Sequence, residues 1–108
     1  MKILKVRLSE VAQERLLDIL KYVEIEWSTS SKNKFLKKFD EKIQQISQQP
    51  KSCPESEDVP GIYKGVVEKH VSFVYRINSD FIDVLTVFDN RQSPQEIKKI
   101  ISKAHNTT

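Results

Sequence analysis

The sequence has too few cysteines, glycines and histidines for several common kinds of site. Its 108 residues include one cysteine, Cys53, which excludes an internal disulfide and a zinc site built from cysteines. Its two glycines, Gly61 and Gly65, do not form a glycine-rich loop that could cradle phosphate groups. The two histidines, His70 and His105, are isolated and lack the spacing of metal ligands. We therefore expect neither a metal nor another cofactor.

The sequence also lacks long hydrophobic runs and a strong charge bias. No stretch approaches membrane-spanning length, and the N-terminus, MKILKVRLSE, is too interrupted for a signal peptide. Hydrophobic residues make up 38% and charged residues 31%, as in folded globular proteins. The net charge of +3 suits an acidic partner but is too small to indicate nucleic-acid binding. We expect one domain over residues 1–108, in the cytoplasm, with no membrane contact and no direct sequence-specific DNA binding.

Two apolar runs, at residues 71–77 and 81–88, predict a β-hairpin. They are rich in Val, Ile, Phe and Tyr, and the turn residues at 78–80 separate them. Both faces of the second run carry apolar side chains, so we expect it to be a central strand covered on both sides. We expect the rest of the chain to cover this sheet.

Helical periodicity replaces alternation between residues 10 and 48. Ser9 is placed to cap a first helix over residues 10–27, and a second helix over residues 32–48 ends at Pro50. The apolar stripe of the first helix holds Ala12, Leu16, Ile19, Leu20, Val23 and Trp27, and that of the second holds Phe35, Leu36, Phe39, Ile43 and Ile46. We expect Trp27 to be an anchor in the core. The short polar link predicts an antiparallel helical hairpin.

The remaining elements complete the predicted fold. Residues 2–8 alternate as a half-buried strand, residues 51–60 form a loop, and a strand follows Gly61. Gly65 inside that strand indicates a bulge or a close approach. A capping box at residues 93–96 opens a short amphipathic C-terminal helix. The sequence thus predicts an α+β fold in which an antiparallel β-sheet packs against an antiparallel two-helix hairpin, in the order β-α-α-β-β-β, plus a short C-terminal helix.

Several cations lie near the predicted sheet, and Arg91 directly follows its last strand. A guanidinium fixed there is suited to bind a phosphate or a carboxylate with two hydrogen bonds. The alternative is an arginine that pairs with Asp89 or with a helix C-terminus. The residues alone leave both interpretations open.

The ordered set of motifs resembles the RelE/ParE superfamily of bacterial type II toxins over residues 3–95. The matching motifs are Leu8-Ser9-x-x-Ala12, Ile25-Glu26-Trp27, Phe35-Leu36, Pro50, Gly61-Ile62-Tyr63-Lys64, Phe73-Val74-Tyr75-Arg76 and the segment from Val84 to Pro94 that contains Asp89-x-Arg91-Gln92. The resemblance implies a toxin whose sheet and helices are wrapped by a cognate antitoxin. We expect partner-binding by Phe73, Tyr75, Leu85 and Val87.

The superfamily has two kinds of activity. On the resemblance, a RelE-like ribosome-dependent mRNA endoribonuclease would use Lys64, Arg76 and Arg91 to hold phosphate and stabilise charge. Other positions, where that branch carries further basic residues or a proton carrier, hold Val66, Ser72 and Ile97. We therefore expect that the chain is not an enzyme.

The preferred interpretation is a ParE-like toxin that inhibits DNA gyrase by binding it. On this interpretation Arg91, Lys98 and Lys99 contact the target. The alternatives are the RelE-like nuclease acting on the ribosome and a non-toxic relative that only binds its antitoxin.

Overall fold

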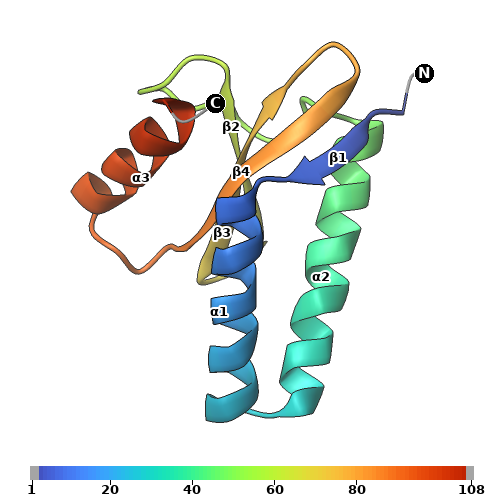
Figure 1. The fold of residues 1–108 in the computed structure, drawn as a ribbon, viewed down its shortest axis with the longest axis vertical. Helices are drawn as coiled ribbons and strands as arrows, with labels where there is room; N and C mark the ends of the chain where they lie inside the picture. The colour runs from blue at the N-terminus through green and yellow to red at the C-terminus, as the bar shows by residue number, and fades with distance from the viewer. Residues whose placement is uncertain (1–2, 107–108) are drawn as a thin grey trace.

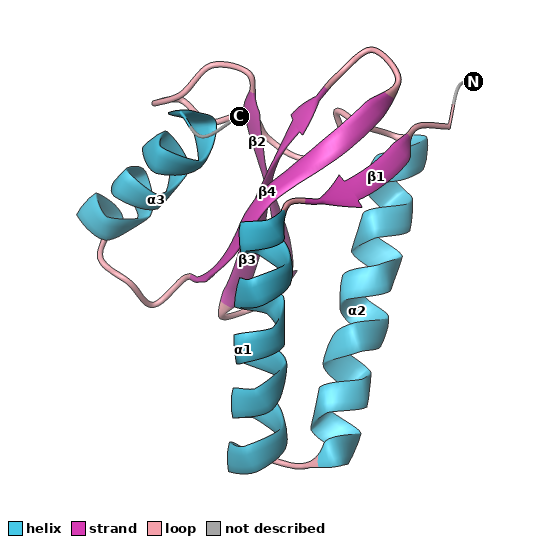
Figure 2. Ribbon diagram, in the orientation of Figure 1, coloured by secondary structure: helices cyan, strands magenta, loops and turns pink. Residues whose placement is uncertain are grey.

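The structure, a computed structural model, describes residues 3–106 and consists of a sheet with helices on both faces (Figure 1). In chain order the elements are β1 (Lys5–Leu8), α1 (Glu10–Glu26), α2 (Thr29–Gln48), β2 (Ile62–Glu68), β3 (Val71–Ile77), β4 (Phe81–Asp89) and α3 (Pro94–Asn106). Helices α1 and α2 form an antiparallel hairpin, and α3 lies apart from them (Figure 2). The predicted α+β class and the order of the elements are confirmed.

The sheet is mixed, with the strand order β1-β4-β3-β2. Strands β2, β3 and β4 are antiparallel neighbours, whereas β1 pairs with β4 in parallel, from Lys5 opposite Phe81 to Leu8 opposite Val84. The expectation of an antiparallel sheet was therefore wrong for the first strand. A parallel pair needs a long connection between its strands, and residues 9–80 supply it.

The first strand begins later than the alternation predicted. The Leu4 amide donates to the Ser47 carbonyl at 3.0 Å, and the Ser47 hydroxyl donates to the Leu4 carbonyl. Leu4 is thus tied to the end of α2 and the strand starts at Lys5. The expected strand residue Lys2 lies outside the described residues.

The helical hairpin covers one face of the sheet. Ser9 caps α1 as predicted, because its Oγ accepts a hydrogen bond from the Ala12 amide at 3.0 Å. Ser28 caps α2 by accepting from the Ser31 amide, so α2 starts at Thr29, earlier than predicted. The end of the hairpin near the α1–α2 connection extends past the sheet (Figure 1). Trp27 lies there and is 73% exposed, so its assignment to the core was wrong.

Two apolar clusters hold the layers together. Beneath the hairpin, Phe35, Phe39 and Ile46 pack with Phe73 and Tyr75 of β3. On the opposite face, α3 packs on β2, β3 and β4; its contributions are Ile97, Ile100 and Ile101, and the sheet contributes Ile62, Val74, Leu85 and Phe88. Strand β4 lies between β1 and β3 and is covered on both faces, as predicted. Within residues 3–106 no helix is long and apolar enough to cross a membrane.

Candidate functional site

Arg91, the residue predicted to contact a target, lies just after β4 and is held by Asp89. Its Nε donates to both carboxylate oxygens of Asp89, at 3.0 and 3.1 Å, and its Nη2 donates to Oδ2 at 2.6 Å. The Arg91 amide also donates to Asp89 Oδ1 at 2.8 Å. These hydrogen bonds lower the pKa of Asp89 and raise the pKa of Arg91. Of the two interpretations that the sequence left open, the pairing with Asp89 is the one observed.

A hollow of about 550 Å³ lies between the helical hairpin and the end of the sheet that carries Arg91, and we call it the hairpin-side hollow. Tyr22 and Trp27 of the hairpin line it, together with His70 of the β2–β3 turn, Asp89 and Arg91. Besides Asp89, the Tyr22 hydroxyl raises the pKa of Arg91. Tyr22 is 51% and Trp27 73% exposed. Tyrosine, tryptophan and arginine are the residue types enriched at the energetic centres of protein interfaces.

Lys64 and Arg76 lie on the other face of the sheet, away from this hollow. Lys64 Nζ is 5.6 Å from the centre of the Phe88 ring, which belongs to the cluster beneath α3. Arg76 pairs in register with Ile62 of the same cluster, and side chains two residues apart on a strand share a face. The structure therefore does not bring Arg91 together with Lys64 and Arg76, the other two residues predicted for a RelE-like nuclease.

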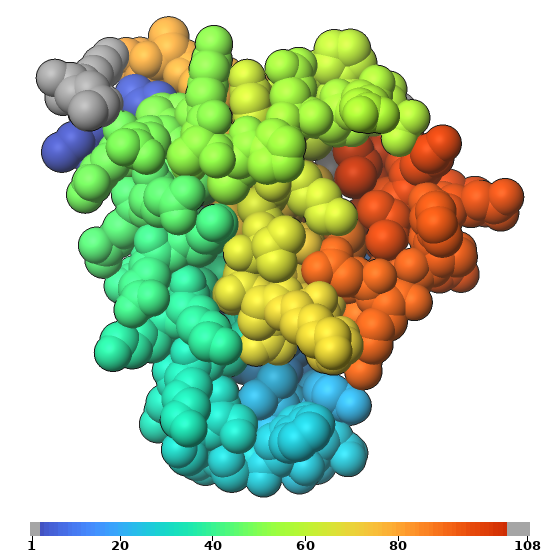
Figure 3. Space-filling model, turned by 180° about the vertical axis from the view of Figure 1, so that it is seen from behind, coloured from blue at the N-terminus to red at the C-terminus, as the bar shows by residue number. Residues whose placement is uncertain are grey.

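Lys98 and Lys99 are exposed on α3. Lys98 Nζ lies 3.7 Å from Asp58 Oδ1, in the loop before β2. Seen from behind, the β2–β3 region lies between the helical hairpin and α3 (Figure 3). Lys98 thus reaches toward the loop that precedes β2, whereas Arg91 faces the hairpin.

The four residues predicted to bind a partner are buried within the chain. Phe73 and Tyr75 are 0%, Val87 1% and Leu85 3% exposed. Phe73, Tyr75 and Val87 pack beneath the helical hairpin, and Leu85 packs beneath α3. Helices of the same chain thus cover these side chains, and binding of a partner by them stays a prediction.

Three positions were singled out because they differ from the nuclease branch. Val66 is 50% exposed on β2, and Ile97 packs against the cluster beneath α3. Ser72 is fully buried, and its hydroxyl has no hydrogen-bond partner among the described residues. None of the three supplies a basic side chain at these positions.

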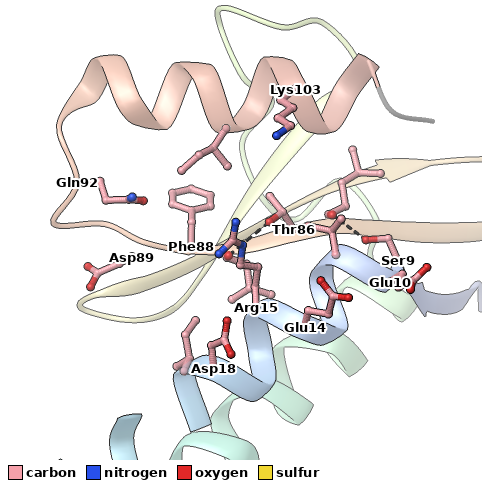
Figure 4. A pocket seen from close by; sticks show the side chains of 15 residues that line it. Ser9, Glu10, Glu14, Arg15, Asp18, Thr86, Phe88, Asp89, Gln92 and Lys103 are labelled. Atoms are coloured by element: carbon pink, nitrogen blue, oxygen red, sulfur yellow. Dashed lines mark hydrogen bonds between the residues drawn. The ribbon is translucent and has the colours of Figure 1, made fainter. Parts of the chain in front are cut away.

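A second opening, of about 800 Å³, separates α1 from α3 beside the C-terminal half of β4, and we call it the inter-helix cleft (Figure 4). Glu10, Glu14 and Asp18 line it from α1, and Ile100 lines it from α3. All five residues from 85 to 89 of β4 border it as well.

Sequence reasoning missed Tyr22, Trp27 and His70 as neighbours of Arg91. Tyr22 lies off the predicted apolar stripe, and His70 is a single turn residue, so neither carried a local signal. Only the packing of the hairpin across the sheet brings them together. In the described part of the chain, no three His, Cys, Asp or Glu residues are grouped so that they could hold a metal ion.

Comparison with known proteins gives a family and a fold. The family model described as the ParE toxin of the type II toxin–antitoxin system, parDE, matches residues 6–94. The chain is similar in structure to the chromosomal ParDE toxin–antitoxin system from P. aeruginosa, with a TM-score of 0.69 and 15% identity over 82% of this chain and 98% of that chain. No curated protein sequence matches the chain.

Two further solved structures share the fold. A mutant of the E. coli toxin RelE in the free state gives a TM-score of 0.60 at 14% identity and covers 97% of each chain. The toxin–antitoxin complex RelBE2 from Mycobacterium tuberculosis gives 0.52 at 15% identity, over 82% of this chain and 99% of that chain. At such identities the likeness establishes the fold.

Proposed function

The chain belongs to the ParE toxin family of type II toxin–antitoxin systems, and on this basis we propose that it inhibits DNA gyrase by binding it, without chemistry of its own. We place it in the cytoplasm, as one toxin domain over residues 1–108 that a cognate antitoxin neutralises. Its likeness to a ParDE system and to a RelBE2 complex supports a protein antitoxin as its partner.

The separation of the basic residues carries this proposal. A nuclease must gather its cations around one scissile phosphate, because misplaced groups stabilise a transition state poorly. Arg91 faces the helical hairpin, whereas Lys64 and Arg76 lie on the face that α3 packs against. This arrangement favours binding by Arg91 over catalysis by all three.

The hairpin-side hollow suits a protein target. The Arg91 guanidinium and the exposed rings of Tyr22 and Trp27 line it together. Side chains of these types provide large contact areas at protein interfaces. In this proposal Arg91 is the central contact and the exposed Lys98 and Lys99 are peripheral contacts that act through charge.

A supercoiling assay with purified gyrase tests the proposal. The chain should block supercoiling, and Arg91→Ala should raise the concentration for half inhibition by about thirtyfold or more, as loss of an interface hot spot does. Lys64→Ala is the matched control, because it removes a cation from the other face and should inhibit as the unchanged chain does. Full inhibition by Arg91→Ala would contradict the site, and no inhibition by the unchanged chain would contradict the function.

One observation favours a second candidate function. Lys64 and Arg76 share a face of the sheet, as two residues of a nuclease set would. Under this alternative the chain cuts mRNA on the ribosome, and Lys64→Ala abolishes cleavage of a translated message in a purified translation system. A chain that neither blocks gyrase nor cuts mRNA would instead be a non-toxic relative that only binds its antitoxin.

A further inference from the structure

Two large aromatic rings line the hairpin-side hollow with their faces uncovered. Tyr22 lies near the end of α1 and is 51% exposed, and Trp27, the C-cap of that helix, is 73% exposed. Among residues 3–106 neither ring stacks on another ring or has a cation over its face. Large aromatic side chains are usually buried, because they carry much apolar area. Both rings are therefore available to a ligand.

The charge that remains around the hollow is negative. Its lining includes the carboxylates of Asp18, Glu68 and Asp89 and the guanidinium of Arg91. Asp89 is hydrogen-bonded to Arg91, so these two charges offset each other. In the described part of the chain, the carboxylates of Asp18 and Glu68 take part in no ion pair or hydrogen bond. The hollow thus offers carboxylates that lack a cation.

The C-terminal end of α1 adds to this negative potential. Val23, in the last turn of α1, lines the hollow together with the C-cap Trp27. Carbonyl groups at the end of a helix carry a partial negative charge, and a cation nearby is stabilising. The last turn of α1 has no basic residue of its own. Lys32 of α2 is engaged with the Glu24 carboxylate, at 2.8 Å. A cation placed in the hollow would therefore interact favourably with the helix end as well.

Aromatic faces and unpaired carboxylates in one hollow of about 550 Å³ match an arginine side chain. A guanidinium stacks on aromatic rings, most favourably on tryptophan, and its edge donates two hydrogen bonds to one carboxylate. A lysine ammonium lacks this planar fork, and a neutral side chain gains no charge interaction. Arginine is also one of the residue types that contribute most to binding at protein interfaces.

We propose that the hairpin-side hollow receives an arginine side chain of the protein target, stacked on Trp27 and paired with the carboxylates of Asp18 and Glu68. The inference rests on the proposed function, because it takes the gyrase target as the owner of that arginine. Arg91 remains a contact beside it, since Asp89 offsets the charge that would repel an incoming guanidinium. The target is favoured over the antitoxin because Arg91, the proposed target contact, lines the same hollow. Complementary charge of this kind supplies specificity.

The fluorescence of Trp27 tests the site without gyrase, because it is the single tryptophan of the chain. The probe is a glycine–arginine–glycine peptide with both ends blocked, titrated at constant ionic strength into the millimolar range expected for one side chain. Its binding should change the fluorescence saturably. The same peptide with citrulline, which has the shape of arginine without its charge, should bind at least about threefold more weakly. A glycine–glutamate–glycine peptide should give no saturable change.

Two variants show whether the peptide lies in the hollow. Glu68→Gln should weaken binding of the arginine peptide about threefold and leave the citrulline peptide unaffected, because it removes a charge and keeps the shape. Glu41→Gln is the matched control, exposed on α2 and outside the hollow, and should change neither. The inference is overturned by no saturable change with the arginine peptide, by equal binding of the two peptides, or by an equal loss in both variants.

The supercoiling assay extends the test to the target. Glu68→Gln should raise the concentration for half inhibition of gyrase by about fivefold or more, because the pair with arginine loses water in the complex. Trp27→Ala should raise it by about tenfold or more, as truncation of an aromatic anchor does. Glu41→Gln should inhibit as the unchanged chain does. If Glu68→Gln and Trp27→Ala both inhibit fully, the inference is overturned.

Two further results separate this inference from the proposed function. A chain that binds the arginine peptide as expected but does not inhibit gyrase would refute gyrase as the target and support the arginine site. A Glu68→Gln variant that loses affinity for the purified antitoxin, with gyrase inhibition unchanged, would assign the hollow to the antitoxin and overturn the inference.

Discussion

The ring of Phe73 lies directly on Gly65, across the β2–β3 pair. A Cβ built on Gly65 would come within 2.6 Å of Phe73 Cζ and 2.7 Å of its Cε1, closer than carbon atoms approach each other in proteins. The close approach that the sequence predicted at Gly65 is thus made by an aromatic ring. Phe73 in turn packs edge-on against Phe39 of α2, with ring centroids 6.0 Å apart, so the ring has little freedom to move away.

Gly65→Ala should therefore destabilise the chain by about 1–3 kcal/mol, the usual cost of overpacking a core. Urea unfolding followed by circular dichroism gives the change. Adding Phe73→Leu should recover part of the loss, so the two changes should be non-additive. A double variant whose loss equals the sum of the single losses would contradict the contact as its cause.

Titration of Asp89 should depend on Arg91. Hydrogen bonds from Arg91 lower the pKa of Asp89, so the folded chain binds that proton less readily than the unfolded chain. The pair therefore stabilises the fold above the carboxyl group's usual pKa of 3.8, and this contribution is lost as the pH falls through the lowered value. Because the side chains are 56% and 37% exposed, it should amount to less than about 1 kcal/mol.

NMR titration of the carboxylates measures this effect. Arg91→Gln should raise the pKa of Asp89 toward its usual value. The substitution should also lower the free energy of unfolding slightly at pH 7, and this difference from the unchanged chain should vanish near pH 2, where Asp89 is protonated. Arg7→Gln is the control, because Arg7 pairs with Asp83 instead, at 3.2 Å. An unchanged Asp89 titration in Arg91→Gln would show that the guanidinium does not act on that carboxylate in solution.

Trp27 should behave as a surface residue. It is 73% exposed, so Trp27→Ala should change the free energy of unfolding by no more than about 0.5 kcal/mol. Phe35→Ala, at a buried position of α2, should cost about 3–5 kcal/mol. Since Trp27 is the single tryptophan, quenching of intrinsic fluorescence by acrylamide reports on it directly. Protection from the quencher would place Trp27 in an interface or in the core.

Tyr75 should couple stability to alkaline pH. It is fully buried and its hydroxyl donates to the Pro50 carbonyl at 2.7 Å, and burial raises its pKa above the usual 10.0. Stability from this group is full below pH 10 and falls as the pH rises, because only the unfolded chain ionises readily. Tyr75→Phe should cost about 1–1.5 kcal/mol at pH 7 and reduce the alkaline loss.

Unfolding in urea between pH 7 and pH 11 measures both effects of Tyr75→Phe. Tyr22→Phe, at an exposed position, should leave the stability at pH 7 unchanged within about 0.5 kcal/mol. A loss as large in Tyr22→Phe as in Tyr75→Phe would contradict the role of the buried hydrogen bond.

Local signals predicted the elements well. The runs at residues 71–77 and 81–88 match β3 and most of β4, and the capping box gave the start of α3 at Pro94. Helix α2 begins at Thr29, before the predicted start at residue 32. The sequence has several serines there that could serve as the N-cap, and only the backbone shows that Ser28 is used. Periods and caps are properties of neighbouring residues, and they are therefore readable in the sequence.

Two relationships between distant elements were not predicted. The parallel pairing of β1 depends on where the helical hairpin returns the chain, and the exposure of Trp27 depends on where the sheet ends beneath the hairpin. Apolar alternation marked Phe73 and Leu85 as important without telling whether helices of the same chain or another protein cover them. The Asp89–Arg91 pair was foreseen as one of two interpretations because its members are two residues apart.

The central place of β4 sets the order in which a newly made chain can fold. In the sheet β4 lies between β1, which precedes the helical hairpin, and β3. Strand β4 is the last strand in the chain and ends at Asp89. Until the ribosome has delivered that segment, β1 has no strand to pair with and the hairpin lacks much of the surface it packs on. Contacts between such distant parts form late and slowly. A growing chain is therefore unable to complete its sheet until β4 has left the ribosome, long after β1 and the helical hairpin have been made.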